Sequence, residues 1–166
     1  RKKFDDKGTL ATIGEKNEII LEQAQELYAN RINKNKRSFD ISDFDISFAR
    51  GLSLEDGTTT LTDFTASIIG EELMKNISNF KNSIKEIVLC GGGRKNKILI
   101  EKIQQNLNSK FKLENIDNYG FDGDFIESQA FAFLAIRSFV NQPISYRWMT
   151  GCKKNECKGG KLIIFK

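Results

Sequence analysis

Two short segments of the sequence carry residue types that could bind or act on a small molecule. The first is a run of three glycines, Gly91, Gly92 and Gly93, between an apolar stretch and a helical pattern. A turn without Cβ atoms lets a ring or a phosphate approach the backbone closely, and the N–H groups of the following helix favour anions. Asn96, in the first turn of that helix, could bond a ligand from the rim. The alternative is a tight turn that binds nothing, and the triplet matches neither the Walker A nor the G-x-G-x-x-G pattern.

The second segment, residues 123–127, opens the strongest helical pattern of the chain. Asp124 as N-cap and Glu127 three residues later match a capping box, and carboxylates at this end are also favoured by the helix dipole. The functional alternative is that Asp122 or Glu127 points into a cleft, where it holds a sugar hydroxyl or assists proton transfer. Spacing alone favours the cap.

Three cysteines and no histidine limit other chemistry. Cys152 and Cys157 lie in a turn with the superficial look of a metal knuckle, but structural zinc takes four ligands and the remaining thiol, Cys90, lies beside the glycines. We therefore expect free thiols. Without histidine, serine–histidine and cysteine–histidine triads are excluded within this chain. An odd cysteine count without a sign of export indicates reduced thiols in the cytoplasm.

The elements that must position these segments form an α/β pattern. Residues 84–90 are predicted to be a buried strand, residues 96–107 a helix and residues 112–116 a second strand, which together make a βαβ unit. The three glycines then lie at the carboxyl end of a strand, the edge that faces the ligand in open α/β sheets. Residues 122–141 are predicted to be a helix ended by Pro143, and we expect its aromatic stripe to pack in a core: Phe125, Phe131, Phe133 and Phe139.

The rest of the chain is predicted to add helices before this unit and strands after it. A first helix covers residues 17–30 with an apolar face of Ile20, Ala24, Leu27 and Tyr28, and residues 29–45 form an exposed connection. A second helix starts near Thr60, where Thr60 and Asp63 match a capping box; its apolar face comprises Leu61, Phe64, Ile68, Leu73 and Ile77. The tail offers strand candidates at residues 146–149 and 162–165.

Composition fits one globular domain. The 166 residues are 39% hydrophobic and 29% charged, with a net charge of +4. The basic excess is scattered and does not indicate a nucleic-acid surface, and no apolar stretch is long enough to span a membrane. The charged start has no apolar run behind it, so it is not a signal peptide. The missing initiator Met indicates that the chain was cut from a longer protein.

Several segments also match longer motifs. The most specific is FDGDFIESQAFAFLA at residues 121–135, and the others are FDDKGTLA at 4–11 followed by Gly14, TLTDFTA at 60–66, IVLCGGGRKN at 87–96, Thr150-Gly151 and CKGG at 157–160. In order and spacing they resemble the anhydro-N-acetylmuramic acid kinase family, with its motif G-x-x-G-D-x-x-E-A-x-A-F-A-W-L-A. Phe121, Ser128 and Phe133 stand there for Ile, Ala and Trp, and none of these changes touches a charged group.

The resemblance implies that residues 1–166 form the C-terminal lobe of a ribonuclease-H-like fold, as in the actin, sugar kinase and Hsp70 superfamily, with a mixed sheet flanked by helices. ATP would lie between two such lobes, with Gly91, Gly92, Gly93 and Asn96 on the adenosine side, and Glu127 would contact the sugar near its anomeric centre. The family opens the 1,6-anhydro ring of 1,6-anhydro-N-acetylmuramic acid with water and phosphorylates the 6-oxygen, giving N-acetylmuramic acid 6-phosphate in cytoplasmic cell-wall recycling. It tends towards dimers.

One departure from the family pattern is large. The family's general base is an Asp in a D-T-G-P-G-N motif upstream of the matched segments, and its first phosphate-binding loop lies further upstream; neither occurs here. Phosphoryl transfer depends on both lobes and on Mg²⁺, which no side chain of this chain is expected to bind. We therefore expect the chain to be inactive without the N-terminal lobe.

Two other interpretations remain open at this point. The chain could be the C-terminal lobe of another sugar kinase, such as a glycerol- or gluconate-type kinase, since these also place three glycines after a strand. It could instead be a nucleotide-binding module without catalysis. A panel of sugars would separate the first from the anhydro-sugar kinase, and a gene encoding no upstream lobe would favour the second.

Overall fold

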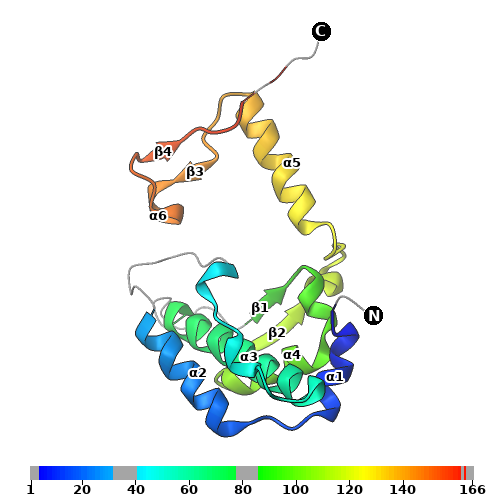
Figure 1. Ribbon diagram of the computed structural model, residues 1–166. Helices are drawn as coiled ribbons and strands as arrows, with labels where there is room; N and C mark the ends of the chain where they lie inside the picture. Colours follow the sequence, from blue (N-terminus) through cyan, green and yellow to red (C-terminus); the bar gives the residue numbers. More distant parts are fainter. Residues whose placement is uncertain (1–3, 32–40, 78–85, 162, 164–166) are drawn as a thin grey trace.

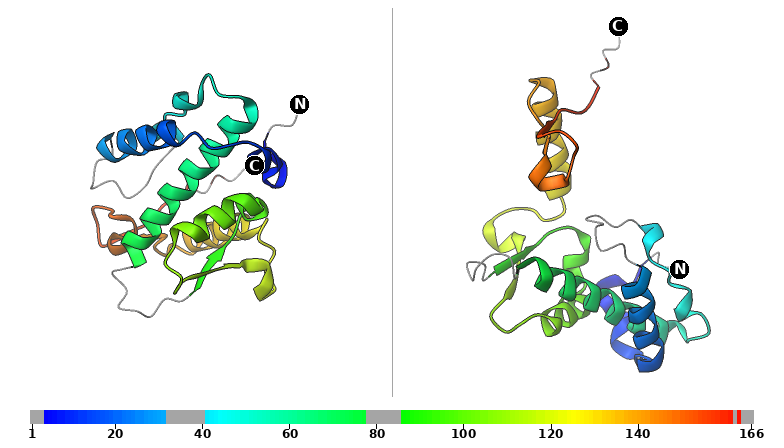
Figure 2. Two further views of the ribbon diagram at one scale, coloured as in Figure 1. Left: turned by 90° about the horizontal axis from the view of Figure 1, so that it is seen from below. Right: turned by 90° about the vertical axis from the view of Figure 1, so that its left-hand side faces the viewer.

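The computed structural model describes residues 4–31, 41–77, 86–161 and 163, and it confirms a mixed α/β chain (Figure 1). Its helices are α1 (Thr9–Ile13), α2 (Glu18–Arg31), α3 (Leu54–Ile77), α4 (Lys97–Asn106), α5 (Ile126–Phe139) and α6 (Arg147–Thr150). Its strands are β1 (Glu86–Leu89), β2 (Lys112–Asn115), β3 (Ser145–Tyr146) and β4 (Glu156–Cys157). Helices α1 to α4 gather with β1 and β2 into one body, and α5 leads away from it to the β3–β4 hairpin (Figures 1 and 2).

Helix α3 organises the core because it packs on both sides. On one side Phe64 and Ile68 are buried together with Leu21 and Ala24 of α2. Three half-buried aromatic side chains complete that cluster: Tyr28, Phe44 and Phe48. The predicted apolar face of α2 is therefore correct at Ala24 and Tyr28, but Leu21 is buried where Ile20 was expected, and Leu27 is 54% exposed.

On its other side α3 packs against α4 and the parallel strands. Ala66 of α3 is fully buried against Ile103 and Leu107 at the α4 side, and Ile87 and Leu113 of the two strands pack against the same cluster. The apolar spacing predicted for residues 96–107 is thereby confirmed, and so is the long apolar face of α3 at Phe64 and Ile68.

The start of α3 differs from the prediction. The helix begins at Leu54, and the hydroxyl of Ser53 accepts the N–H of Asp56 at 3.0 Å as its cap. Thr60 lies inside the helix with no exposed surface, and its hydroxyl donates to the carbonyl of Asp56 at 2.8 Å. The predicted capping box of Thr60 and Asp63 is wrong because the Ser53 cap starts the helix two turns earlier. Asp63 instead forms an ion pair with Lys102 of α4 at 2.6 Å.

The predicted βαβ unit is confirmed. β1 pairs with β2 in parallel, with Ile87 opposite Leu113, and α4 connects them. β1 was expected to be buried on both faces, and it is not. Helix α4 covers one face of the β1–β2 pair, and Val88 on the other face is 46% exposed. Residues 84 and 85 of the predicted strand lie outside the described residues, as do residues 32–40 of the predicted connection.

Helix α5 corrects a second expectation. Its span, Ile126–Phe139, lies within the predicted range, but the aromatic stripe is exposed rather than packed in a core. Phe125, Phe131, Phe133 and Phe139 are between 58% and 72% exposed. Figure 1 shows the physical reason: α5 leads away from the body, and no described helix or sheet of the body packs along it.

The tail forms a hairpin different from the predicted one. β3 pairs antiparallel with β4, with Ser145 opposite Cys157, and residues 147–150 form the helical turn α6 rather than a strand. Of the second strand candidate, residues 162, 164 and 165 lie outside the described residues. Cys152 and Cys157 are free thiols, as predicted. None of the helices in the described segments is both long and apolar enough to cross a membrane.

Candidate functional site

The three glycines form a turn directly after β1, as predicted; we call Gly91–Gly93 the glycine turn. Gly91 has φ 78° and ψ 176°, a conformation essentially restricted to glycine. A short 3₁₀ turn over Gly92–Lys95 follows, and Asn96 then caps α4 by accepting the N–H of Leu99 through Oδ1 at 3.1 Å.

Open space surrounds the glycine turn. A Cβ atom placed on Gly91, Gly92 or Gly93 would meet no atom of another segment within 4 Å. Gly92 and Gly93 have no positive φ, so neither backbone conformation nor packing within the described chain requires glycine at these two positions. The tight-turn interpretation therefore explains Gly91 alone. At Gly92 and Gly93 the space beside the backbone is open.

The side chain of Arg94 folds back behind the turn and is only 5% exposed. Its Nη1 donates to the carbonyl of Gly91 at 2.9 Å and to Asp124 Oδ1 at 2.6 Å. Its Nε donates to Asp117 Oδ2 at 2.7 Å, and Nη2 reaches the other oxygen of the same carboxylate at 3.2 Å. One guanidinium thus joins the glycine turn, the end of β2 and the start of α5.

Main-chain groups join the same segments. The N–H of Gly91 donates to the carbonyl of Gly123 at 2.9 Å, and the N–H of Gly123 donates to Asp117 Oδ1 at 3.0 Å. A Cβ atom on Gly123 would lie 2.4 Å from Nε of Arg94, so only glycine leaves room for the guanidinium. The structure therefore brings the glycine turn against the loop that leads into Glu127, two segments that the sequence predicted separately.

Three side chains behind the glycine turn stay ionised at neutral pH: Arg94, Asp117 and Asp124. Hydrogen bonds from Arg94, and then from the N–H of Gly123, lower the pKa of Asp117 from 3.8 to about 2. Hydrogen bonds from Arg94 and then Lys95 lower the pKa of Asp124, and the same contacts with Asp117 and Asp124 raise the pKa of Arg94. Groups that stay ionised near pH 7 are poorly suited to general acid–base work. Asp117 and Asp124 are therefore ion-pair partners of Arg94 that join the segments around the glycine turn.

Glu127 lies in the first turn of α5 and is exposed. The predicted capping box is wrong: the N-cap position is Phe125, which makes no side-chain bond, and the Asp124 carboxylate is held by Arg94 and Lys95. Asp122, the other candidate, accepts the N–H of Asp124 at 3.0 Å. Among the described residues nothing bonds the Glu127 carboxylate, so it can bind a ligand without losing an internal contact.

Asn96 lies at the α4 end of the turn and has a structural contact there. Besides capping α4, its Oδ1 lies against Gly8, where a Cβ atom would come within 2.3 Å. Gly8 precedes α1, whose start is held by Asp5, since Asp5 Oδ1 accepts the N–H of Leu10 at 2.9 Å. The amide nitrogen of Asn96 makes no hydrogen bond among the described residues and is the group available to donate to a ligand.

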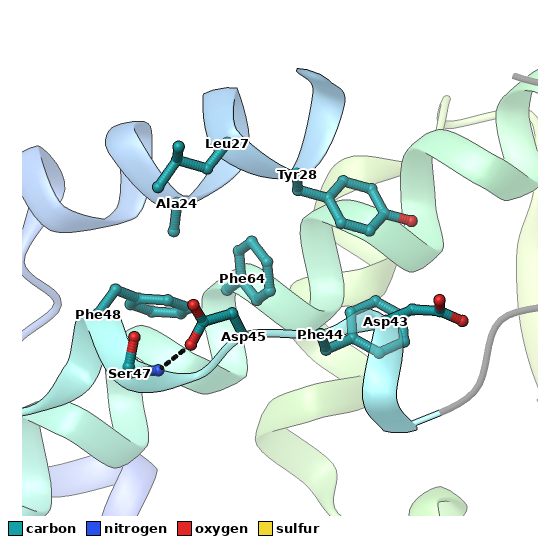
Figure 3. A pocket seen from close by; sticks show the side chains of 9 residues that line it. All are labelled: Ala24, Leu27, Tyr28, Asp43, Phe44, Asp45, Ser47, Phe48 and Phe64. Atoms are coloured by element: carbon teal, nitrogen blue, oxygen red, sulfur yellow. Dashed lines mark hydrogen bonds between the residues drawn. The ribbon is translucent and has the colours of Figure 1, made fainter. Parts of the chain in front are cut away.

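A cavity of about 200 Å³ lies elsewhere in the body (Figure 3). Four aromatic side chains and the polar residues Asp43, Asp45 and Ser47 contribute to its lining. Tyr28 stacks on Phe44 at 5.7 Å, and Phe48 meets Phe64 edge-on at 5.0 Å between ring centroids. Burial raises the pKa of Tyr28. None of the predicted site residues lines this cavity, and we attribute it to packing between α2, α3 and the segment that precedes α3.

Sequence reasoning missed Arg94, which organises this region. A signal was present: an arginine directly after the glycines, with aspartates at positions 117 and 124 on the far side of β2. Which aspartate Arg94 contacts depends on the register of β1 against β2 and on the path of the loop after β2, and neither follows from the local sequence pattern.

Comparison with known proteins supports the motif resemblance. The sequence profile described as anhydro-N-acetylmuramic acid kinase matches residues 1–163. Among curated relatives, the anhydro-N-acetylmuramic acid kinase of Pelagibacter ubique strain HTCC1062 is 48% identical over 97% of this chain and 43% of its own length. That of Zymomonas mobilis is 33% identical over 89% of the chain and 39% of its own, and that of Brucella canis is 36% identical over 72% and 31%.

A βαβ unit with a glycine turn at the carboxyl end of its first strand, hydrogen-bonded to the loop before the next helix, is the kind of arrangement found in α/β proteins that bind small ligands. The profile match covers nearly the whole chain, and the chain therefore belongs to the anhydro-N-acetylmuramic acid kinase family. It spans less than half the length of the curated relatives that it matches.

Proposed function

We propose that the chain contributes the C-terminal lobe of an ATP-dependent enzyme that converts 1,6-anhydro-N-acetylmuramic acid to N-acetylmuramic acid 6-phosphate. In this reaction water adds at the anomeric carbon, the 1,6-anhydro bond breaks, and the freed 6-oxygen takes the γ-phosphoryl group of ATP, leaving ADP. The setting is cytoplasmic recycling of cell-wall sugars. The relatives named above are called anhydro-N-acetylmuramic acid kinases, which supports a kinase acting on this sugar.

One observation of the structure carries the proposal. The 2.9 Å hydrogen bond from Gly91 to Gly123 holds the open glycine turn beside the loop that leads into Glu127. A nucleotide on the turn and a sugar at Glu127 would then lie at the same edge of the β1–β2 pair. Phosphoryl transfer needs this proximity, because catalysis rests on positioning the two reactants.

Within this lobe each residue has a limited role. Gly91, Gly92 and Gly93 admit the adenosine end of ATP to the backbone, and Asn96 Nδ2 donates to it. Glu127 accepts a hydrogen bond from the sugar near its anomeric centre, where charge develops as the ring opens. The general base that activates water comes from the N-terminal lobe, which completes the cleft. A homodimer of the complete protein is compatible with this arrangement.

Mg²⁺ would be held by the nucleotide phosphates and the other lobe. In the part of the chain that the structure describes, no three Cys, Asp or Glu side chains converge to hold a metal ion. We therefore assign no step that involves Mg²⁺ to side chains of this chain.

The test uses the full-length protein with ATP and 1,6-anhydro-N-acetylmuramic acid, and mass spectrometry of the product. We expect a ring-opened 6-phosphate, and a loss of roughly 10²- to 10⁴-fold in kcat for Glu127→Ala, the range for a group that assists proton transfer or charge development. Glu101→Ala is the matched control, since Glu101 is also exposed but lies on α4.

Two results would contradict the proposal in different ways. A folded protein that binds ATP but forms no 6-phosphate would refute the substrate, and activity on glycerol or gluconate would then favour the broader sugar-kinase interpretation. Full activity of Glu127→Ala, equal to that of Glu101→Ala, would refute the role of Glu127 but would not affect the substrate assignment.

A further inference from the structure

Arg94 contacts both segments of this lobe that the proposed reaction requires to be held in register, the glycine turn and the loop before α5. Its guanidinium reaches the Gly91 carbonyl in the glycine turn, Asp117 after β2 and Asp124 before α5. These partners are 3, 23 and 30 residues away in sequence. With only 5% of its side chain exposed, the arginine is enclosed by the segments that it joins.

We propose that Arg94 is a positioning residue: it sets the distance and angle between the glycine turn and the first turn of α5, and so between the nucleotide and Glu127. This inference rests on the proposed function, because it assumes that the two segments serve one reaction. Arg94 touches neither reactant in this account and acts through the glycine turn and Glu127.

The geometry of the contacts requires a guanidinium. The planar fork donates to both oxygens of Asp117 while Nη1 serves Gly91 and Asp124 at the same time. A lysine ammonium has three donors on a flexible stem and cannot reproduce a bidentate contact with a carboxylate. Lys95 already binds Asp124 from the exposed side, and it makes no contact with Asp117.

The backbone by itself fixes this junction weakly. Between the glycine turn and the loop before α5, the main-chain hydrogen bond of the described residues is the one from Gly91 to Gly123. A second contact at this junction runs from the N–H of Gly123 to Asp117 Oδ1 at 3.0 Å. The bonds of Arg94 to Asp117 and Asp124 add contacts at other points, and Gly123 supplies the space in which the side chain lies.

The expected effect is therefore on the chemical step. A displacement of about 1 Å between reacting groups can cost on the order of 10²-fold in rate. Arg94→Lys should leave a folded protein whose kcat falls by roughly 10- to 100-fold, with a smaller change in KM for either substrate, because each half of the site remains intact.

Arg137→Lys is the matched control. Arg137 lies on α5, and its side chain donates from Nε to the Pro143 carbonyl at 2.6 Å and from Nη2 to the Tyr146 hydroxyl at 3.1 Å. It thus makes two hydrogen bonds where Arg94 makes four, and it directs them towards the tail hairpin. If Arg94 only stabilised the fold, both variants would lower Tm and kcat in parallel.

The decisive measurement combines Arg94→Lys with Glu127→Ala in the full-length enzyme. If Arg94 acts through Glu127, Arg94→Lys should cost less than about 3-fold in the Glu127→Ala background, because residues that act as a unit are strongly non-additive. Should Arg94→Lys fail to fold, Asp124→Ala removes one acceptor of the same guanidinium and is measured in its place.

The outcomes are separable. Multiplicative losses in the double variant, or equal losses of kcat for Arg94→Lys and Arg137→Lys, would overturn the positioning role while the wild-type activity stands. Absence of the 6-phosphate product from the wild-type enzyme would refute the proposed function, and the positioning role with it.

Discussion

The N–H of Asn17 donates a 3.0 Å hydrogen bond to the hydroxyl of Thr60, a side chain with no exposed surface in the middle of α3. The same hydroxyl donates to the Asp56 carbonyl one turn earlier. The main chain just before α2 is thereby tied to the helix that organises both parts of the core.

Replacing Thr60 with valine, which has the same shape, should destabilise the protein through the Asn17 N–H. That donor would lose its partner in a partly buried position, and an unsatisfied polar group costs about 1–3 kcal/mol. The measurement is the free energy of unfolding in urea. Thr65→Val serves as control, since its hydroxyl is exposed and bonds only the Leu61 carbonyl, and a surface change of this kind stays within about 0.5 kcal/mol. Equal losses in both variants would show that the bond to Asn17 contributes nothing.

Alanine substitutions in the glycine turn should distinguish a glycine that the backbone conformation requires from one that leaves room for the nucleotide. Gly91→Ala places a side chain at φ 78° and ψ 176° and should lower stability by about 1–3 kcal/mol. Gly93→Ala should leave Tm unchanged, because its Cβ meets no atom of another segment. It should nevertheless raise KM for ATP by roughly 10- to 100-fold, the equivalent of about 1–3 kcal/mol of crowding. An unchanged KM in Gly93→Ala would exclude close approach of the nucleotide at this position.

The Arg94–Asp117 contact predicts a pH dependence of stability. The pKa of Asp117 is about 2 in the folded chain against an ordinary 3.8, so its contribution is complete above the ordinary value and is lost as pH falls towards 2. The stability difference between wild type and Asp117→Asn should therefore be constant from about pH 5 to 7 and shrink between about pH 4 and 2.

Urea unfolding at a series of pH values measures that difference. Asp122→Asn is the control, because Asp122 lies in the same loop but does not contact Arg94. A difference between wild type and Asp117→Asn that persists unchanged down to pH 2 would mean that the charge of Asp117 is not what stabilises the junction.

The isolated 166-residue chain should be catalytically silent and prone to associate with itself. It holds neither the upstream base motif nor the first phosphate loop, and phosphoryl transfer needs both lobes. Its α5 exposes an aromatic stripe that includes Phe131 at 66% and Phe139 at 72%, and contiguous apolar patches drive association.

Sedimentation at increasing protein concentration and an activity assay test these two expectations. Phe131→Ser with Phe139→Ser should shift the isolated chain towards monomer. A strictly monomeric wild-type chain, or turnover comparable to that of the full-length enzyme, would contradict them.

Much of the local structure followed from sequence. Apolar spacing at Ile100, Ile103 and Leu107 predicted α4 and its buried face, and the short apolar runs around it predicted β1 and β2. The prediction succeeded because these elements bury one face against a neighbour, so the spacing of their apolar residues indicates whether the element is a helix or a strand. The glycine turn was found for a similar reason, since its position between strand and helix is fixed along the chain.

The sequence by itself determined the family and the order β1, α4, β2 and α5 around the glycine turn. The tertiary structure decided what each polar residue does. The sequence predicted Thr60 as part of a helix cap, but its hydroxyl accepts the N–H of Asn17, 43 residues away. It also predicted Asp124 as a helix cap, but its carboxylate accepts a hydrogen bond from Arg94, 30 residues away. Local rules cannot choose among such partners, because a side chain takes the partner that three-dimensional packing brings within reach. The same limit applies to the phenylalanines of α5, whose periodicity predicts an apolar face but not what covers it.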